Sequence, residues 1–235
     1  ACFAPAIDFD GGKYGIGLLS KKAPIHLQTM ALPGREEART LILAEFEDYI
    51  YCCTHLSLTE EDRMKSLDIL KAFAISYKKP LFWAGDMNAE PESDFIKELQ
   101  KDFRILSDPK QHTFPAPAPK ETIDYVVAFK QNDKGFALVS SEVVNEPVAS
   151  DHRPIVVELR TAEKALAPAE PDRLHGRHGK AMGAHKLLRP APRGRQIVIW
   201  GGWEYPRGRD LKAGKSQFLH QRINVRIVSG FPRNI

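Results

Sequence analysis

The sequence has few cysteines and no long hydrophobic run, and both absences narrow the kind of protein it can encode. Only three of its 235 residues are cysteines, and Cys52 and Cys53 are neighbours whose side chains point to opposite faces of a strand. An odd count in this arrangement disfavours a disulfide framework or a zinc site and favours buried thiols. No apolar run approaches the ~18 residues that cross a bilayer, so the sequence predicts no membrane span.

The chain also lacks an initiator methionine and a signal peptide, since it starts at Ala1 in strand-like sequence. We therefore expect that an N-terminal segment is missing. For this reason, the localisation of the protein cannot be judged from targeting signals. With 43% hydrophobic and 27% charged residues, the composition is that of a globular protein with an ample core. The length fits one large domain, or a medium domain with an appendage.

Acidic residues are scarce in the last third of the chain. Residues 1–160 contain 19 basic and 25 acidic residues, a net charge of −6, whereas residues 161–235 contain 15 and 5, a net charge of +10. We place a domain boundary near Arg160 and predict that 161–195, rich in Ala, Pro, Gly and Arg, is a flexible linker. The whole of 161–235 is expected to be a poorly ordered basic extension, although QIVIWGGWEYP and INVRIVSGF are typical of short strands.

The first 160 residues combine many strand patterns with two helical ones. An Asp-Gly-Gly turn between CFAPAIDF and GKYGIGLLSK predicts a hairpin. Helices are predicted from a Thr59 cap to about Tyr77, with Asp62 at the capping-box position, and from about Ser93 to Lys101. This content indicates packed sheets with helices outside. The other predicted strands are PIHLQTMAL, TLILAEFE, YIYCCTHLS, residues 81–88, TIDYVVAF, FALVSSEVV and RPIVVELR.

Polar side chains recur where the predicted strands begin or end. LFWAGDMN closes with Asp86 and Asn88, and since side chains i and i+2 share a face of an extended chain, both can point at one object. Gly85 before them permits a turn or a close backbone approach. A plain turn explains these residues when they are taken alone, but five such places in one order favour a shared site. The candidate residues are His55, Asp86, Asn88, Asp124, Asp151 and His152.

In their order along the chain, five segments resemble the endonuclease/exonuclease/phosphatase superfamily, which includes deoxyribonuclease-, exonuclease III- and sphingomyelinase-like enzymes. The resemblance covers residues 1–160 and no part of the basic extension. It implies a four-layered α/β sandwich, with two mixed β-sheets packed face to face and helices outside. It also implies Mg²⁺- or Mn²⁺-dependent hydrolysis of phosphoester bonds. The segments are GGKYGIGLLS, THLSL, AGDMNAEP, TIDYVV and SDHRPIVVEL.

By this resemblance, Asp86 orients and activates the attacking water, and Asn88 holds the phosphate or that water. Asp151 looks like a metal ligand. Hard carboxylate oxygens suit Mg²⁺, which keeps several waters and takes one or two carboxylates from a protein. A metal held in this way acts as a Lewis acid on the phosphoryl group.

Two histidines complete the implied site. His152 resembles the histidine that contacts the scissile phosphate, with Asp124 as its paired carboxylate, and His55 looks like a second phosphate-contacting histidine. A carboxylate beside an imidazole fixes its tautomer and favours the cationic form, which donates to phosphate oxygens. An Asp–His pair is also a common structural contact, so the pair alone does not establish catalysis.

The chain departs from the family at its start. Members begin with a strand that carries an Asn and a second strand that ends in Gln-Glu, whose Glu is a principal metal ligand, and neither precedes Gly11. We therefore expect an N-terminally truncated sandwich that binds Mg²⁺ weakly. Glu36 and Glu37 lie in a predicted turn next to Arg39, and we do not assign them as replacement ligands.

The sequence thus predicts a monomeric, metal-dependent hydrolase of phosphodiesters or phosphomonoesters. The acidic domain disfavours tight binding of duplex DNA, but small molecules, lipid headgroups and nucleic acids all stay open as substrates. In the loop PKQHTFPAPAPKE, Thr113 is either a phosphate contact or a plain turn residue. One alternative function is a catalytically impaired fragment or scaffold, because a fold does not guarantee its activity. Another is nucleic-acid binding through the basic extension, where Trp200, Trp203 and Tyr205 lie among arginines.

Overall fold

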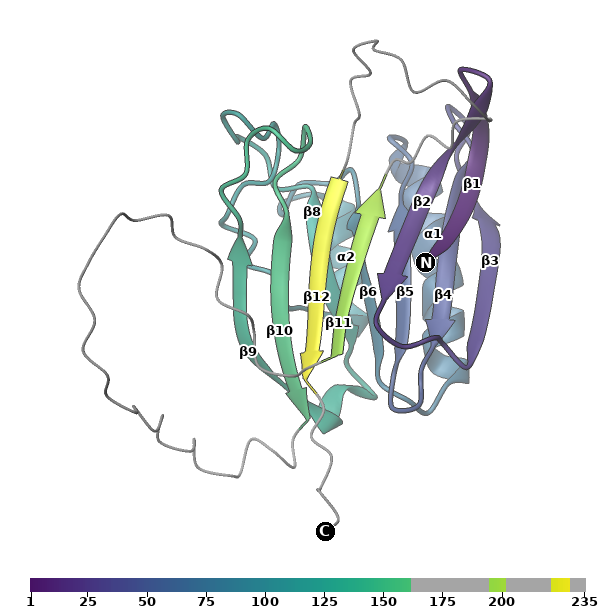
Figure 1. The fold of residues 1–235 in the computed structure, drawn as a ribbon, viewed down its shortest axis with the longest axis vertical. Helices are drawn as coiled ribbons and strands as arrows, with labels where there is room; N and C mark the ends of the chain where they lie inside the picture. The colour runs from purple at the N-terminus through teal and green to yellow at the C-terminus, as the bar shows by residue number, and fades with distance from the viewer. Residues whose placement is uncertain (162–194, 202–220, 229–235) are drawn as a thin grey trace, which may run out of the picture.

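The computed structural model describes residues 1–161, 195–201 and 221–228, which form two six-stranded β-sheets that face each other (Figure 1). In spatial order, the first sheet contains β1 (Cys2–Phe9), β2 (Gly12–Ser20), β11 (Arg195–Gly201), β12 (Gln221–Val228), β10 (Ile155–Thr161) and β9 (Phe136–Val143). The second contains β3 (His26–Leu32), β4 (Arg39–Glu45), β5 (Ile50–His55), β6 (Leu81–Asp86), β8 (Asp124–Phe129) and β7 (Phe103–Ile105). The predicted mixed α/β sandwich is confirmed.

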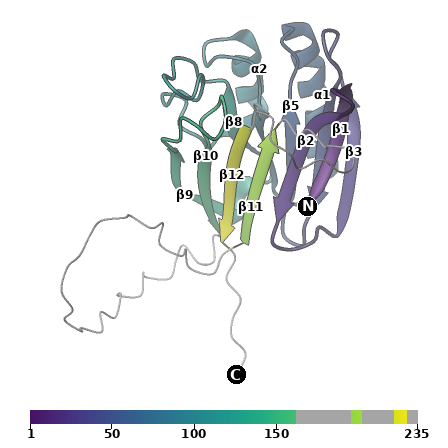
Figure 2. The same cartoon turned by 45° about the horizontal axis from the view of Figure 1, so that its top comes forward.

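The helices α1 (Glu60–Ser76) and α2 (Asp94–Asp102) lie behind the second sheet in Figure 1, on the face turned away from the first. The view in Figure 2 gives the same order of layers. Alternation along the strands divides the interior accordingly. In β4, Leu41 packs in the core under the helices and Ile42 in the core between the sheets. Cys52 and Cys53 divide in the same way, and both are buried free thiols, as predicted.

The two helices begin where the sequence places them, but only one is capped by a side chain. Ser93 accepts a hydrogen bond from the backbone of Ile96 at 3.3 Å, as an N-cap residue does. Thr59 precedes α1 without such a bond. The expected capping box is wrong, because the carboxylate of Asp62 instead accepts hydrogen bonds from Arg35 at 2.8 and 3.0 Å. This pair ties the turn before β4 to the first turn of α1.

The described parts of the basic extension are two strands of the first sheet. β11 and β12 fall on the segments whose pattern is typical of strands, and they pair with each other, with β2 on one side and with β10 on the other. The linker was expected over 161–195, but residue 161 ends β10 and residue 195 begins β11. Its other residues lie outside the described part of the chain, as do Trp203 and Tyr205. The domain boundary near Arg160 therefore stays a prediction. Among the described helices, none combines the length and hydropathy that a membrane span requires.

Candidate active site

Three polar side chains form one row across the second sheet. β5 runs parallel to β6 and pairs His55 with Asp86, and β8 runs antiparallel to β6 and pairs Asp86 with Asp124. The row lies where β5 and β6 end and β8 begins. Strand register thus gathers at one end of the sheet three residues that are far apart in the sequence.

Gly85 allows β5 and β6 to meet closely beside this row. A Cβ atom added at Gly85 would lie 1.9 Å from the backbone oxygen of Thr54, far inside van der Waals contact. The hydroxyl of Thr54 also accepts a hydrogen bond from the indole nitrogen of Trp83 at 2.8 Å. The close backbone approach expected at Gly85 is therefore present, and it fixes the two strands that carry His55 and Asp86.

Asp86, Asp124 and His152 form a buried cluster whose potential ligand atoms lie within 4.8 Å of one another. His152 Nδ1 is hydrogen-bonded to Asp124 Oδ2 at 2.9 Å, and His152 Nε2 lies 4.0 Å from Asp86 Oδ2. Burial lowers the pKa of His152, but the charge and hydrogen bond of Asp124, with the charges of Asp86 and Asp151, raise it to about 9. His152 is therefore an imidazolium at neutral pH, held by Asp124 in one orientation.

The carboxyl group of Asp86 lies in surroundings that disfavour its charge. Its pKa is raised because burial disfavours the charged form and because the charge of Asp124 lies close to it. The positive charge of His152 and a hydrogen bond from the backbone of Asn88 act in the opposite direction. A carboxyl group whose pKa is raised in this way is a suitable base near neutral pH.

Asn88 does not continue the strand that carries Asp86. β6 ends at Asp86, and Asn88 has a left-handed backbone with φ of 47°, so the predicted alternation over 81–88 is wrong at this position. Asn is among the residues that tolerate this conformation. The backbone N–H of Asn88 donates to Asp86 Oδ1, and its side-chain amide donates to the carbonyl of Leu56, both at 2.8 Å. A turn therefore brings Asn88 beside Asp86.

Asp151 and His152 lie in the loop before β10, which packs against the segment 113–121. The backbone N–H of Ala116 donates to the carbonyl of Asp151 at 2.6 Å, and the ring of Phe114 lies 4.7 Å from that of His152. Thr113 is fully buried, and its hydroxyl accepts a hydrogen bond from Ile123 at 3.4 Å. The hydroxyl of Thr113 thus contacts the backbone of the neighbouring segment.

The side chain of Asp151 is only half-buried and accepts a hydrogen bond from the hydroxyl of Ser150 at 3.2 Å. Its charge raises the pKa of His152 and of Tyr14, which lies on β2 in the opposite sheet. Asp151 is not one of the three residues of the buried cluster, which consists of Asp86, Asp124 and His152. Carboxylate oxygens of this kind are the ligands that Mg²⁺ and Mn²⁺ prefer.

His55 lies on the other side of Asp86, in different surroundings. Its Nε2 is 3.4 Å from Asp86 Oδ2. Burial lowers the pKa of His55, and the positive charges of Arg39 and His152 lower it further, to about 3. At neutral pH, His55 is therefore a neutral imidazole, whereas His152 is charged.

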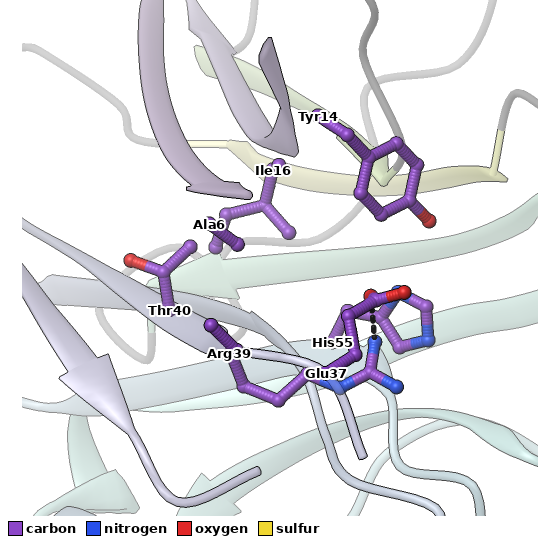
Figure 3. A pocket seen from close by; sticks show the side chains of 9 residues that line it. Ala6, Tyr14, Ile16, Glu37, Arg39, Thr40 and His55 are labelled. Atoms are coloured by element: carbon purple, nitrogen blue, oxygen red, sulfur yellow. Dashed lines mark hydrogen bonds and ion pairs between the residues drawn. The ribbon is translucent and has the colours of Figure 1, made fainter. Parts of the chain in front are cut away.

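A pocket opens beside His55, between the first hairpin and the start of β4 (Figure 3). The polar ends of Tyr14, Glu37, Arg39 and His55 gather on one side of it. Arg39 NH1 donates to Glu37 Oε1 at 3.0 Å. Sequence reasoning did not assign Tyr14 or Arg39 to the site and left Glu37 in a turn. Glu37 lies in the bend before β4, and Arg39 is the first residue of β4, so strand alternation did not indicate this pair.

Glu36 connects this pocket to the loop after His55. Its carboxylate accepts hydrogen bonds from the hydroxyl of Ser57 at 2.8 Å, from the backbone of Leu58 at 2.7 Å and from Arg39 at 3.4 Å. Burial alone would raise the pKa of Glu36, but these bonds and one from its own backbone lower it to about 2. Glu36 therefore joins the turn before β4 to the loop after β5.

The protein is thus an α/β sandwich that carries a row of acidic residues and histidines at one end of its second sheet. The family model described as "Endonuclease/Exonuclease/phosphatase family" matches residues 3–152, well over half of the chain. The chain belongs to this family, whose members are hydrolases that act on phosphoester bonds. No curated protein matches the chain.

Several solved structures match part of the chain at low sequence identity. An endonuclease/exonuclease/phosphatase family protein from Bacteroides thetaiotaomicron is 12% identical, with a TM-score of 0.47 over 59% of this chain and 73% of that one. A mannosyl-6-phosphatase from the same species is 11% identical, with a TM-score of 0.46 over 59% and 74%. The human nocturnin catalytic domain is 16% identical, with a TM-score of 0.42 over 59% and 69%.

Proposed function

We propose that the chain is a divalent-metal-dependent phosphoesterase in which an activated water attacks the phosphorus atom. One observation carries this proposal: Asp86, Asp124 and His152 are buried together at the end of one sheet, with their ligand atoms within 4.8 Å. Burying two carboxyl groups side by side is costly unless a cation or a proton compensates them. A site for phosphoryl chemistry explains why that cost is retained.

In this proposal, Asp151 would hold Mg²⁺ or Mn²⁺. When bound, the metal would supply positive charge to the phosphoryl oxygens and to the leaving oxygen. Asp86 accepts the proton of the attacking water, for which its raised pKa is suited. The amide of Asn88, fixed by its bond to Leu56, has a second N–H with which to hold the phosphate or that water.

The two histidines take different roles. His152, as an imidazolium oriented by Asp124, donates from Nε2 to a non-bridging oxygen of the phosphate. His55, as a neutral imidazole, donates one hydrogen bond to a second oxygen and adds no charge. The distance of 3.4 Å between His55 Nε2 and Asp86 Oδ2 supports a role on the same phosphate.

The test is hydrolysis by the full chain of a set of phosphoesters with and without Mg²⁺ or Mn²⁺. The set contains an aryl phosphate, a sugar phosphate, an inositol phosphate, sphingomyelin and a plasmid. We expect turnover of at least one ester that requires the metal and is lost in Asp86→Asn but not in Asp68→Asn, which changes an exposed carboxylate on α1. Turnover that survives in Asp86→Asn would contradict the proposed base, and catalytic inactivity with every ester would favour a scaffold.

A further inference from the structure

Among the described strands, β3 is the last strand of the second sheet, and it lies on the outer side of the sandwich in Figures 1 and 2. The outer edge of such a strand presents backbone N–H and C=O groups that can pair with another chain. All seven residues of β3 pair with β4 in continuous register, from His26 opposite Glu45 to Leu32 opposite Arg39. The strand is therefore regular enough to accept one more neighbour along its whole length.

The other three edges in the described part of the sandwich carry features that block such pairing. β1 contains Pro5, next to which its register shifts, and the charged residue Asp8. β9 carries the exposed Glu142, and its pairing with β10 is irregular. β7 has only three residues. Proline, bulges, charges and short length are the usual protection of edge strands, and β3 has no proline, no bulge and no Asp, Glu, Lys or Arg.

The face of β3 that turns towards the first sheet is left uncovered. Thr29 is opposite Ile42, a residue of the core between the sheets, so Thr29 lies on the inner face of the second sheet. Leu27, two residues away, lies on the same face. Nevertheless, Thr29 is exposed, Leu27 is 42% exposed, and Ile25 just before the strand is 67% exposed. Apolar surface therefore accompanies the open edge of β3.

We propose that β3 pairs with β3 of a second copy of this chain, antiparallel and about a two-fold axis, which joins the two second sheets into one. Such pairing is closed, because it uses the same edge of both copies and leaves none for a third. Head-to-tail pairing is disfavoured, since β7 at the other end of the sheet is too short to accept β3. The inference does not rest on the proposed function, and it departs from the monomer expected from the sequence.

The charges at the two ends of β3 favour a second copy as the partner. Lys21 and Lys22 precede the strand and are exposed. Glu36 and Glu37 follow it, and Arg35 ties this end to the acidic first turn of α1, so the carboxylates outnumber the cations here. Antiparallel pairing brings the start of one β3 to the end of the other. The basic end of each copy therefore meets the acidic end of its partner, which is electrostatically complementary.

Full overlap of the seven residues places Thr29 opposite Thr29 of the second copy. Directly opposite residues have Cα atoms about 4.5–5.5 Å apart, which is within the range of a disulfide. Thr29→Cys should therefore crosslink two copies under mild oxidation. The experiment uses a Cys2→Ala background, because Cys2 is the one cysteine that is not buried.

The matched control for the crosslink is Ala31→Cys, which changes another exposed residue on the same face of β3. Ala31 would be opposite Leu27 of the second copy, so the two altered positions would be about 14 Å apart, or four residues along a strand. Ala31→Cys alone should therefore not crosslink. A mixture of Ala31→Cys and Leu27→Cys chains should crosslink to each other.

Sedimentation equilibrium of the full chain measures the assembly without crosslinks. We expect a reversible dimer at about 0.1–1 mM protein, since one pair of strands is a small interface. Thr29→Lys places two like charges opposite each other and should weaken the dimer at least about fivefold. Thr29→Val keeps the shape of the side chain and should retain the dimer. Ser140→Lys, at an exposed position of β9, is the matched control, and circular dichroism checks that each variant is folded.

A monomer at every concentration would overturn the inference, as would equal crosslinking by Thr29→Cys and Ala31→Cys. A dimer that Ser140→Lys weakens as much as Thr29→Lys would place the interface elsewhere. Assemblies that grow beyond the dimer with concentration would contradict closed pairing about a two-fold axis. These outcomes do not depend on hydrolysis, so the inference and the proposed function can fail separately.

Discussion

The two sides of the site lie at the same end of the second sheet but have opposite electrostatics. On one side, Asp86 and Asp124 surround His152, which is kept positively charged. On the other, His55 is neutral and lies among Tyr14, Glu37 and Arg39. The same residue type, histidine, therefore has a pKa of about 9 on one side and about 3 on the other.

This difference depends on the neighbours of each histidine. The carboxylate of Asp124 keeps His152 charged and oriented. Next to the charge-balanced pair of Glu37 and Arg39, a second cation would be unfavourable, and His55 stays neutral. Asp86, in contact range of both histidines, joins the two sides. The predictions below change each side of this comparison in turn.

The largest effect is expected from removing the carboxylate of Asp86, because Asp86 lies next to both His55 and His152. Asp86→Asn should lower the rate of metal-dependent phosphoester hydrolysis by about 10³-fold, within the range for loss of a positioned acid or base. The amide keeps the shape of the side chain and removes a buried charge, so the protein should stay folded. The measurement is the rate of hydrolysis of an aryl phosphate by Asp86→Asn and by the unmodified chain, and Asp68→Asn is the control. A rate within about threefold of the unmodified chain would exclude Asp86 as the base.

Asp124→Asn should greatly reduce the difference in pKa between His152 and His55. Without the carboxylate, the pKa of His152 should fall from about 9 towards its usual value. We expect hydrolysis at neutral pH to fall by about 10²-fold, because the imidazolium loses both charge and orientation. An NMR titration of the His152 ring measures the shift directly. A structural role of Asp124 alone would change stability and leave that titration unaltered.

A smaller effect is expected from Asp151→Asn, which removes one hard ligand from the reactive side. The affinity for Mg²⁺ should fall about tenfold, or ~1.4 kcal/mol, as measured by isothermal titration. The affinity for propyl phosphate without metal should change by less than about threefold. Metal affinity that is unchanged in this variant would place the cation elsewhere.

The smallest effect is expected on the pocket side, from Glu36→Gln. The folded pKa of Glu36, about 2, is below its unfolded value, so its carboxylate stabilises the fold above about pH 4.5 and loses this contribution as the pH falls towards 2. At pH 7 the variant should therefore be about 1 kcal/mol less stable than the unmodified chain. The difference should vanish near pH 2. Urea unfolding at several pH values tests this, and an equal difference at every pH would exclude the charge as its cause.

Much of this fold follows from local patterns that the sequence contains. The strands, the two helices and the first hairpin lie where alternation and turn residues predict them, because each depends only on neighbours in the chain. The neighbours Cys52 and Cys53 face two different cores for the same reason. The short strand β7 was not predicted, since its three residues are too few for a periodic pattern.

The candidate site was only partly predictable. His55, Asp86 and Asp124 could be placed at strand ends, but their order across the sheet depends on which strands pair and in which register. Asn88 was placed near Asp86 for the wrong reason, because a left-handed turn replaced the expected extended chain. Asp62 likewise bonds to Arg35 in place of its own helix end, since the stronger charged partner lies in a distant turn.

By itself, the sequence determined the family, the alternating strands and the types of residue available for phosphoryl chemistry. These depend on composition and on spacing within a few residues. Only the tertiary structure decided that one histidine is charged and the other neutral, and that Tyr14, Glu37 and Arg39 form a pocket beside His55. The physical reason is that burial, charge and hydrogen bonding act through space, and the partners that set them come from strands far apart in the chain.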